Sequence, residues 1–260
     1  MKRWALLFIL FSFAAYSQTS EASNARIGAL CKVSHPSYKN VVWGCRRIKK
    51  GETLESLFGD RWVDVARFNR IDRRHTYPGI SIKVPKNLDD IKEFNPLPVE
   101  YSPAENEGKF ILVDLSEQYL GAYEYGKLVF SAPAATGEKE NETPRGEFKV
   151  TASHRYHKSS KYFIEKTETP YPMNHALRFY INREGVTYWI HGRDIPGYPA
   201  SHGCIGLYDE AMQKKQYKYP KEPVLEDAKK LFEWVLGTPQ YNGFQVLKDA
   251  PRIKIIGKAP

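Results

Sequence analysis

One stretch of the chain, WIHGRDIPGYPASHGCIGL from Trp189 to Leu207, limits what the sequence can fold into more than any other. Its prolines and glycines exclude a helix through the middle, because proline cannot donate the helical hydrogen bond and glycine loses the most backbone freedom on ordering. The residues VTYWIH, which end at His191, alternate so that Tyr188 and Ile190 share one face while Trp189 and His191 share the other. We therefore expect a strand that ends at His191, followed by an irregular loop.

This loop carries two His-Gly pairs and a cysteine, which together suggest a nucleophilic site. A thiol reacts well only after deprotonation, and an imidazole within hydrogen-bonding reach can take its proton. His191 comes from a separate strand and can approach Cys204 from the side, so we predict that His191 is the base and Cys204 the nucleophile. His202 lies only two positions before Cys204, so we predict that it orients the other groups.

The residues around the cysteine have predicted roles in holding the substrate. Gly203 leaves room beside the nucleophile, and the backbone N–H groups of Gly203 and Cys204 could form an oxyanion hole, particularly if a helix begins after the loop. We expect Ser201 to hydrogen-bond an imidazole. Together with Gly192, Ser201 and Gly203 are the predicted positioning residues.

Two alternative interpretations of the loop stay open at this point. His191, His202 and Cys204 are competent zinc ligands that would leave a coordination position for water. Their spacing is not a common zinc pattern, however, and no glutamate stands beside them. The other alternative is an inert loop that merely contains histidine. We predict no metal and no organic cofactor. The remaining histidines show no comparable grouping and are expected on the surface or in the core: His35, His75, His154, His157 and His175.

The start of the chain, MKRWALLFILFSFAAYSQ, has two cations followed by an apolar run that is too short to span a bilayer. Ala15-Tyr16-Ser17 offers a small-x-small cleavage site, so residues 1–17 are predicted to be a signal peptide. The alternative is a retained membrane anchor. The prediction implies an exported protein of the periplasm or cell wall, without a transmembrane anchor after processing.

Charge and cysteine content fit an exported protein. The formal net charge is +9, and an exported basic protein favours an anionic polymer or a carboxylate-bearing substrate over nucleic acid. The alternative is a generally basic, solvated surface without such a partner. The chain has three cysteines. Cys31 and Cys45 stand close enough in sequence to bridge in an oxidising compartment, which would leave Cys204 unpaired.

The chain divides into five segments that differ in composition and in hydrophobic pattern. After the signal peptide, residues 18–45 are polar and irregular, residues 46–85 read as strand, helix, helix and strand, and residues 86–108 read as a linker. Residues 109–257 read mostly as strands, with one amphipathic helix between Pro223 and Gly237. The predicted fold class is mostly β with peripheral helices, preceded by a small βααβ unit.

The small unit, residues 46–85, resembles the LysM module. The matching residues are Gly51-Glu52-Thr53-Leu54, Asn69, Pro78-Gly79 and Val84-Pro85. The resemblance implies binding of the N-acetylglucosamine-containing glycan of cell walls. The alternative is a small α/β spacer that binds no ligand.

Residues 109–210 resemble the YkuD, or L,D-transpeptidase, catalytic domain. The matching motifs are His191-Gly192, Ser201-His202-Gly203-Cys204-Ile205, Thr143-Pro144-Arg145-Gly146-Glu147-Phe148, and Pro172-Met173 with Leu177-Arg178-Phe179. The resemblance implies a β-rich, sandwich-like fold in which the cysteine is the nucleophile and the first histidine its base. The loop before Ser201 is shorter than in many members. Gly206 stands where the family usually has Arg or Asn.

By this resemblance we expect an exported peptidoglycan L,D-transpeptidase that works on stem peptides and binds glycan strands. Cys204 would take the acyl group of a tetrapeptide stem and pass it to an amine, giving 3–3 cross-links, lipoprotein attachment or D-amino acid exchange. An outer-membrane lipoprotein is one candidate acceptor. The alternatives are an L,D-carboxypeptidase or other wall peptide hydrolase of the same fold, and a non-catalytic wall-binding protein. We expect glycan binding and thiol chemistry to lie on separate domains.

Overall fold

The structure is a computed structural model that describes residues 30–164, 166–237 and 241–260. The predicted signal peptide, residues 1–17, lies outside the described residues. Within the described ranges, no helix is both long enough and apolar enough to cross a membrane.

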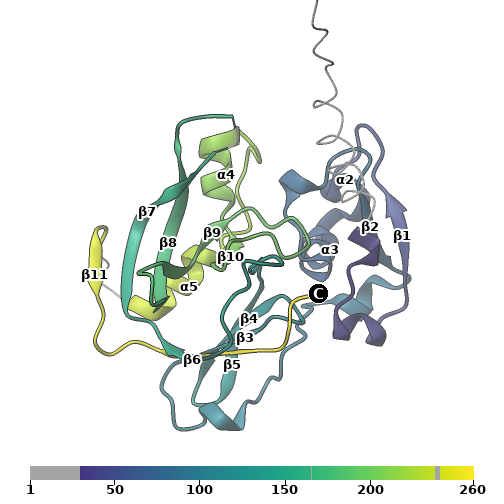
Figure 1. The fold of residues 1–260 in the computed structure, drawn as a ribbon. Coiled ribbons are helices and arrows are strands. Elements are labelled where there is room, and N and C mark those ends of the chain that lie inside the picture. The colour runs from purple at the N-terminus through teal and green to yellow at the C-terminus, as the bar shows by residue number, and fades with distance from the viewer. Residues whose placement is uncertain (1–29, 165, 238–240) are drawn as a thin grey trace, which may run out of the picture.

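Two five-stranded sheets form the larger part of the fold (Figure 1). The first runs in the order β10 (Ile205–Tyr208), β9 (Thr187–Arg193), β8 (Pro170–Ile181), β7 (Ala152–Phe163) and β11 (Phe244–Val246). The second runs in the order β5 (Lys127–Pro133), β4 (Tyr119–Glu124), β3 (Phe110–Asp114), β12 (Arg252–Ile256) and β6 (Gly146–Lys149). The pairs β9–β10 and β3–β12 are parallel, and the others are antiparallel. The predicted mostly-β class is confirmed.

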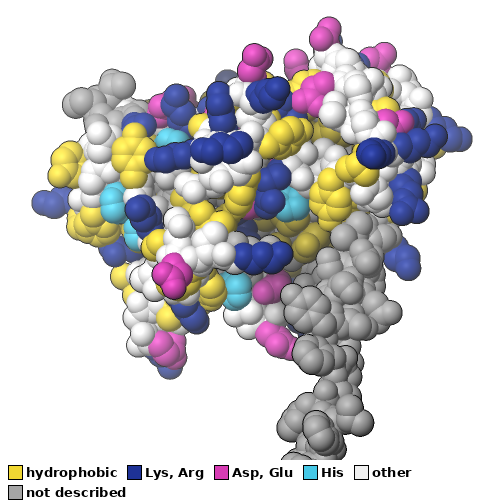
Figure 2. Space-filling view, turned by 90° about the horizontal axis from the view of Figure 1, so that it is seen from above, with side chains coloured by type: hydrophobic (Ala, Val, Ile, Leu, Met, Phe, Trp, Pro, Cys, Tyr) yellow, Lys and Arg dark blue, Asp and Glu magenta, His cyan; other side chains and the backbone are white. Residues whose placement is uncertain are grey.

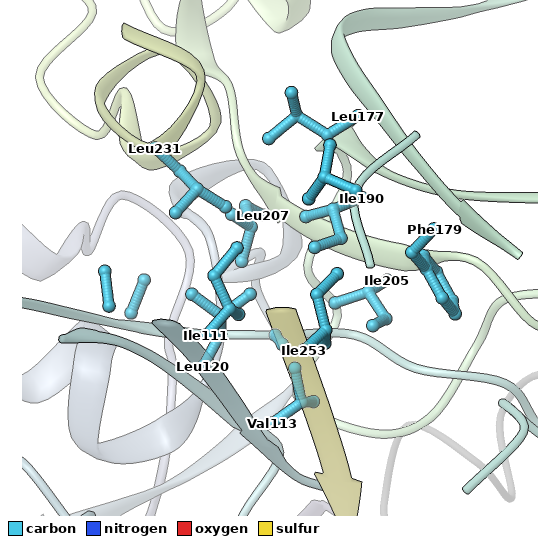
Figure 3. Packing of buried hydrophobic residues seen from close by; sticks show 14 of the residues in the cluster. Ile111, Val113, Leu120, Leu177, Phe179, Ile190, Ile205, Leu207, Leu231 and Ile253 are labelled. Carbon is cyan, nitrogen blue, oxygen red and sulfur yellow. The ribbon is translucent and has the colours of Figure 1, made fainter. Parts of the chain in front are cut away.

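The main core lies where side chains of both sheets meet those of α5 (Asp227–Leu236), as Figure 3 shows. The apolar run in β3 is buried on both faces, as its composition predicts. Ile111 and Val113 enter the main core, whereas Phe110 and Leu112 enter a smaller cluster on the other side of the sheet. The strand is therefore fixed between two apolar layers.

The two helices of this part follow β10 along the chain. α5 begins at Asp227 rather than near Pro223, because the N–H groups of Val224 and Leu225 donate to the Glu210 carboxylate at 2.7 and 3.0 Å and stay outside the helix. It ends at Gly237, as predicted. The preceding helix, α4 (Glu210–Tyr217), has a weak apolar pattern and no sequence-based prediction covers it.

The N-terminal part folds in the order β1 (Trp43–Arg47), α2 (Leu54–Phe58), α3 (Trp62–Asn69) and β2 (Ser81–Pro85). β1 and β2 pair antiparallel, and β1 starts before the predicted boundary at residue 46. The side chain of Thr53 caps α2 by accepting from the N–H of Ser56. The side chain of Asn69 bonds the backbone of Lys83 in both directions and fastens α3 to β2. Thr53 and Asn69, two of the LysM-like motif residues, therefore stabilise the fold of the N-terminal part.

The segment before β1 is bound to the N-terminal part rather than lying free. Cys31 and Cys45 form a disulfide, which confirms the sequence-based pairing and leaves Cys204 as the free cysteine of the described chain. Leu30 and Tyr38 are buried in the same apolar cluster as α3. Among the residues that the structure describes, six 3-10 turns complete the helical elements: Leu30–Lys32, Pro36–Asn40, Gly59–Arg61, Arg73–His75, Leu88–Ile91 and Ser102–Ala104.

The predicted linker, residues 86–108, does join the two parts, but it packs against them along its length. Ile91, Leu97 and Ala104 are buried, and the N–H of Leu128 on β5 donates to the carbonyl of Val99. The connection therefore holds the N-terminal part close to the second sheet.

Three buried ion pairs join the N-terminal part to the strand-rich part. Each pair joins an arginine in or just after α3 to a carboxylate of the strand-rich part. The pairs are Arg67 with Asp227, Arg70 with Glu117, and Arg73 with Glu210. Ile195 and Tyr208 complete the apolar cluster around α3. The two parts therefore share one buried interface.

Candidate active site

The parallel pair β9–β10 brings the two halves of the histidine-cysteine loop together. Gly206 lies opposite His191 in the register, and Ile190 faces the main core together with Ile205. Because side chains alternate along a strand, Trp189 and His191 project from the opposite face of the sheet, as predicted, and so does Cys204. β9 continues past His191 to Arg193, because its last residues pair with β10.

His191 is held in one tautomer by its own strand. Its Nδ1 lies 2.8 Å from the carbonyl oxygen of Gly192. A carbonyl can only accept, so Nδ1 carries the hydrogen and Nε2 keeps its lone pair. Burial lowers the pKa of His191 to about 3, an effect that the Gly192 hydrogen bond only partly offsets. The imidazole is therefore neutral at physiological pH and able to accept a proton.

Cys204 lies at the edge of a small apolar cluster. Its neighbours there are Met173, Ala176 and Trp189. Burial raises the pKa of the Cys204 thiol, while a hydrogen bond with the Trp189 backbone and the nearby Arg193 charge act in the opposite direction. The free protein thus holds a neutral thiol on the same face as a neutral imidazole, and proton transfer must accompany attack on a substrate.

The turn before Cys204 is fixed by backbone hydrogen bonds. Ser201 Oγ donates to the carbonyl of Cys204 at 2.6 Å and accepts from the N–H of Gly203 at 3.1 Å. Thr143 Oγ1 donates to the carbonyl of Gly203 at 2.9 Å. Ser201 therefore bonds backbone rather than an imidazole, and the N–H of Gly203 already has an acceptor. Both observations differ from the sequence-based roles.

Gly203 is required by the conformation of this turn. Its φ is +105°, and a Cβ atom there would overlap Cε1 of Tyr188. A side chain would therefore be strained and would collide with the ring. The chain then enters strand β10 rather than a helix. The helix that would have strengthened the predicted oxyanion hole therefore does not follow Cys204.

His202 points toward the end of β7 rather than toward His191. Its ring stacks on Tyr162 at 4.2 Å between centroids, and Nε2 lies 3.8 Å from the carboxylate of Glu138. The group that orients His191 is the Gly192 carbonyl. The orienting role predicted for His202 is therefore not supported by these contacts.

Two histidines that sequence reasoning left ungrouped lie near the candidate site. His157 on β7 stacks on Trp189 at 4.4 Å between centroids, and its Nδ1 lies 3.2 Å from Nδ1 of His154. Burial lowers the pKa of His157 to about 4, with a further contribution from His154. The alternation of β9 already placed Trp189 beside His191, but the strand pairing that brings in His157 leaves no local signal in the sequence.

The loop between the two His-Gly pairs is held by contacts from distant parts of the chain. Asp194 accepts hydrogen bonds from the hydroxyls of Tyr171 and Tyr217 at 3.2 and 3.1 Å, and it lies 3.1 Å from Arg74. The N–H of Ile195 donates to Asp72 at 2.7 Å. Arg74 and Asp72 belong to the N-terminal part, which therefore helps to shape this loop.

The charged groups of the described chain are spread widely. Figure 2 shows Lys and Arg side chains over much of one face, with histidines among hydrophobic side chains, consistent with the formal net charge of +9. Within the described residues, no group of three or more His, Cys, Asp or Glu side chains is arranged to hold a metal ion. The chemistry that the site offers is that of a thiol and a neutral imidazole on one face of the sheet.

Comparisons with known proteins agree with this chemistry. The family model of the L,D-transpeptidase catalytic domain, YkuD, matches residues 108–247. No curated protein is found to match the chain.

Among the solved structures that the chain matches are three L,D-transpeptidases. An L,D-transpeptidase from Xylanimonas cellulosilytica is 24% identical over 74% of this chain and 79% of its own, with a TM-score of 0.43. One from Stackebrandtia nassauensis is 21% identical over 78% and 69%, with a TM-score of 0.41. L,D-transpeptidase 1 from Mycobacterium tuberculosis is 17% identical over 57% and 62%, with a TM-score of 0.36. The last match spans less than two thirds of the mycobacterial chain.

Proposed function

The chain belongs to the L,D-transpeptidase catalytic domain (YkuD) family of cysteine-nucleophile acyltransferases, and from this premise we propose that it is an exported peptidoglycan L,D-transpeptidase. The observation that carries the proposal is the placement of Cys204 and His191 on one face of the parallel pair β9–β10. The Gly192 carbonyl leaves Nε2 of that histidine free to accept a proton.

In the first half of the reaction, Sγ of Cys204 attacks the carbonyl between the L-centre and the D-centre of a tetrapeptide stem. The thiol proton passes to Nε2 of His191, and the same nitrogen then protonates the leaving amine. The carbon–nitrogen bond breaks, the terminal D-residue departs, and a thioester on Cys204 remains.

In the second half, an amine attacks the thioester carbonyl and His191 takes its proton. The carbon–sulfur bond breaks, and the thiolate recovers that proton from His191. The acceptor is a stem-peptide side chain for a 3–3 cross-link, a lipoprotein lysine, or a free D-amino acid. Water as acceptor would make the protein a hydrolase of the same bond.

The developing oxyanion needs a hydrogen-bond donor near Cys204. Because the N–H of Gly203 donates to Ser201, we assign this role to the N–H of Cys204 itself. Ser201 then acts by holding the turn, and Gly192 by fixing the imidazole. The site needs no metal or organic cofactor for either half of the reaction.

The test is incubation of the purified mature chain with disaccharide-tetrapeptides, followed by mass spectrometry of the products. We expect cross-linked dimers in the wild type and none in Cys204→Ala, with a circular dichroism spectrum unchanged in the variant. Release of the D-residue without dimers or exchange products would establish the hydrolase instead. Wild-type protein that leaves all muropeptides unchanged would support a non-catalytic wall-binding protein.

We further propose that residues 46–85 bind wall glycan, on the strength of their LysM-like motifs. Tyr77 is an exposed aromatic residue of the turn before β2, suited to stack on a sugar ring. Tyr77→Ala should weaken cosedimentation with sacculi, whereas Tyr125→Ala, which removes an exposed tyrosine of the other part, should not. Equal binding by all three proteins would identify the segment as a spacer.

Export is tested separately from activity. A full-length chain expressed in a bacterium should be recovered from the periplasmic or wall fraction with its N-terminus near residue 18. Recovery of the uncut chain from the membrane fraction would identify residues 1–17 as a retained anchor.

A further inference from the structure

Gly206 removes a side chain from the reactive face of the sheet. It lies on β10 opposite His191, and its neighbours Ile205 and Leu207 are buried in the main core. A side chain at position 206 would therefore project on the same face as the Cys204 thiol. Because residue 206 is glycine, the space beside the nucleophile on this face is open to another side chain.

The side chain of Arg193 occupies the space that Gly206 leaves. A Cβ atom at position 206 would lie 2.5 Å from Cδ and 2.7 Å from Cβ of Arg193. Arg193 is the last residue of β9, two positions after His191, and its side chain crosses over the backbone of β10. Glycine at 206 and arginine at 193 are therefore a matched pair, because any larger residue at 206 would displace the arginine.

The guanidinium of Arg193 is held in place but is not saturated. One Nη2 hydrogen is donated to the carbonyl of Ala200, and the charge lies 5.8 Å from the centre of the Tyr171 ring. Its Nε is buried and has no hydrogen-bond partner in the structure. A buried donor without a partner is costly, and a ligand that accepts from it removes that cost.

We propose that Arg193 is the substrate-positioning cation of this site and binds the terminal carboxylate of the acyl donor beside Cys204. This inference rests on the proposed function. The bond that Cys204 would cleave joins the donor to a single terminal D-residue, whose carboxylate lies on the carbon attached to the scissile nitrogen. A planar guanidinium is well suited to bind a carboxylate.

Electrostatic effects at the site agree with this placement. Burial is the largest influence on the pKa values of Cys204 and His191, and the Arg193 charge lowers both. The cation is thus close enough to act on both reacting groups. An anion bound to it would lie next to the scissile bond.

The experiment compares two soluble donors, a tetrapeptide stem with a free terminal carboxylate and the same stem with a terminal carboxamide. The wild type should prefer the free carboxylate. Arg193→Met should lower kcat/KM for the carboxylate donor by about 10- to 100-fold, the range expected for a hydrogen bond to a charged group. The same variant should change kcat/KM for the carboxamide donor little, so that the preference disappears.

Arg155→Met is the matched control. Arg155 is also half-buried, packs its guanidinium on an aromatic ring, Phe232, and has a buried Nε without a partner, but it lies on β7 and has no place in the proposed site. It should keep the wild-type preference between donors. The double variant Arg193→Met with Gly206→Arg restores a guanidinium from the other strand and should recover a preference for the carboxylate donor.

The outcomes separate this inference from the proposed function. Equal losses for both donors in Arg193→Met, with no recovery in the double variant, would show a structural role and overturn the inference. Wild-type turnover without preference between donors would also overturn it, while leaving the proposed function intact. Wild-type protein that converts neither donor would overturn the proposed function and this inference with it.

Discussion

The buried pair Arg70–Glu117 offers the sharpest test of whether the N-terminal part is integral to the fold. Arg70 is 1% exposed, and its Nη2 lies 2.9 Å from the carboxylate of Glu117. The same nitrogen donates to Ser37 Oγ, and Nε donates to the carbonyl of Glu117. Arg70→Met removes the cation and leaves the carboxylate buried with only Ser37 as a side-chain partner.

The magnitude follows from the loss of one member of a buried pair, which costs about 3–5 kcal/mol. For a chain of this size about 1 kcal/mol corresponds to about 2–4 °C, so the thermal midpoint should fall by about 6–20 °C. The assay is thermal unfolding followed by circular dichroism at neutral pH. Arg70→Met with Glu117→Gln should recover much of the loss, since the remaining amide is neutral and can still bond Ser37.

Arg252→Met is the control for this experiment. Arg252 pairs with Glu107 and Glu147 at the surface, where its side chain is 48% exposed, so the midpoint should stay close to that of the wild type. An Arg70→Met protein that melts at the wild-type temperature would refute the argument that the two parts form one buried unit.

Three further predictions concern the candidate site. His191→Ala should slow acylation by about 10²–10⁴-fold, the usual contribution of a general base. His202→Ala should have a smaller effect, because the His202 ring lies against Tyr162. Pre-steady-state kinetics with a soluble donor measures both rates, and a larger loss in His202→Ala than in His191→Ala would contradict this assignment. Gly203→Ala should reduce both the thermal midpoint and turnover, because its Cβ meets Tyr188; an active, stable variant would contradict the geometry. Burial raises the pKa of the Cys204 thiol, so the folded protein should contain less thiolate than the unfolded one at the same pH. Alkylation of Cys204 by iodoacetamide should therefore reach half its maximal rate at a higher pH in the folded protein than in the unfolded one. The same or a lower pH for half-maximal alkylation in the folded protein would contradict this prediction.

Local patterns in the sequence account for much of the fold. The alternation before His191 predicts Ile190 and Trp189 on opposite faces of the strand, and the structure agrees. The apolar run of β3 is buried on both faces, and Gly237 ends α5. These signals lie within a few residues of one another, where side-chain period and backbone preference decide the outcome.

Contacts between distant residues account for most of what the sequence did not reveal. The Gly192 carbonyl rather than His202 orients His191, because the turn at Ser201 directs the second imidazole toward Tyr162. Arg193 has no local signal in the sequence, because the space for its side chain depends on Gly206 of the neighbouring strand.

The buried interface with the N-terminal part has no local signal in the sequence for a similar reason. The partners of the arginines around α3 lie more than forty residues away along the chain, such as Glu117 for Arg70 and Asp227 for Arg67. Charge complementarity of this kind has no local period, so no sequence window contains it.

Intact-protein mass spectrometry during turnover of a tetrapeptide donor without an acceptor amine decides whether Cys204 is an acyl-transferring nucleophile. We expect a covalent adduct whose mass equals the donor less its terminal D-residue, mapped by proteolysis to Cys204. The adduct should be absent in Cys204→Ala and should persist when a chelator is present. Turnover of the donor by Cys204→Ala, or complete loss of wild-type activity with chelator and its return with zinc, would contradict it.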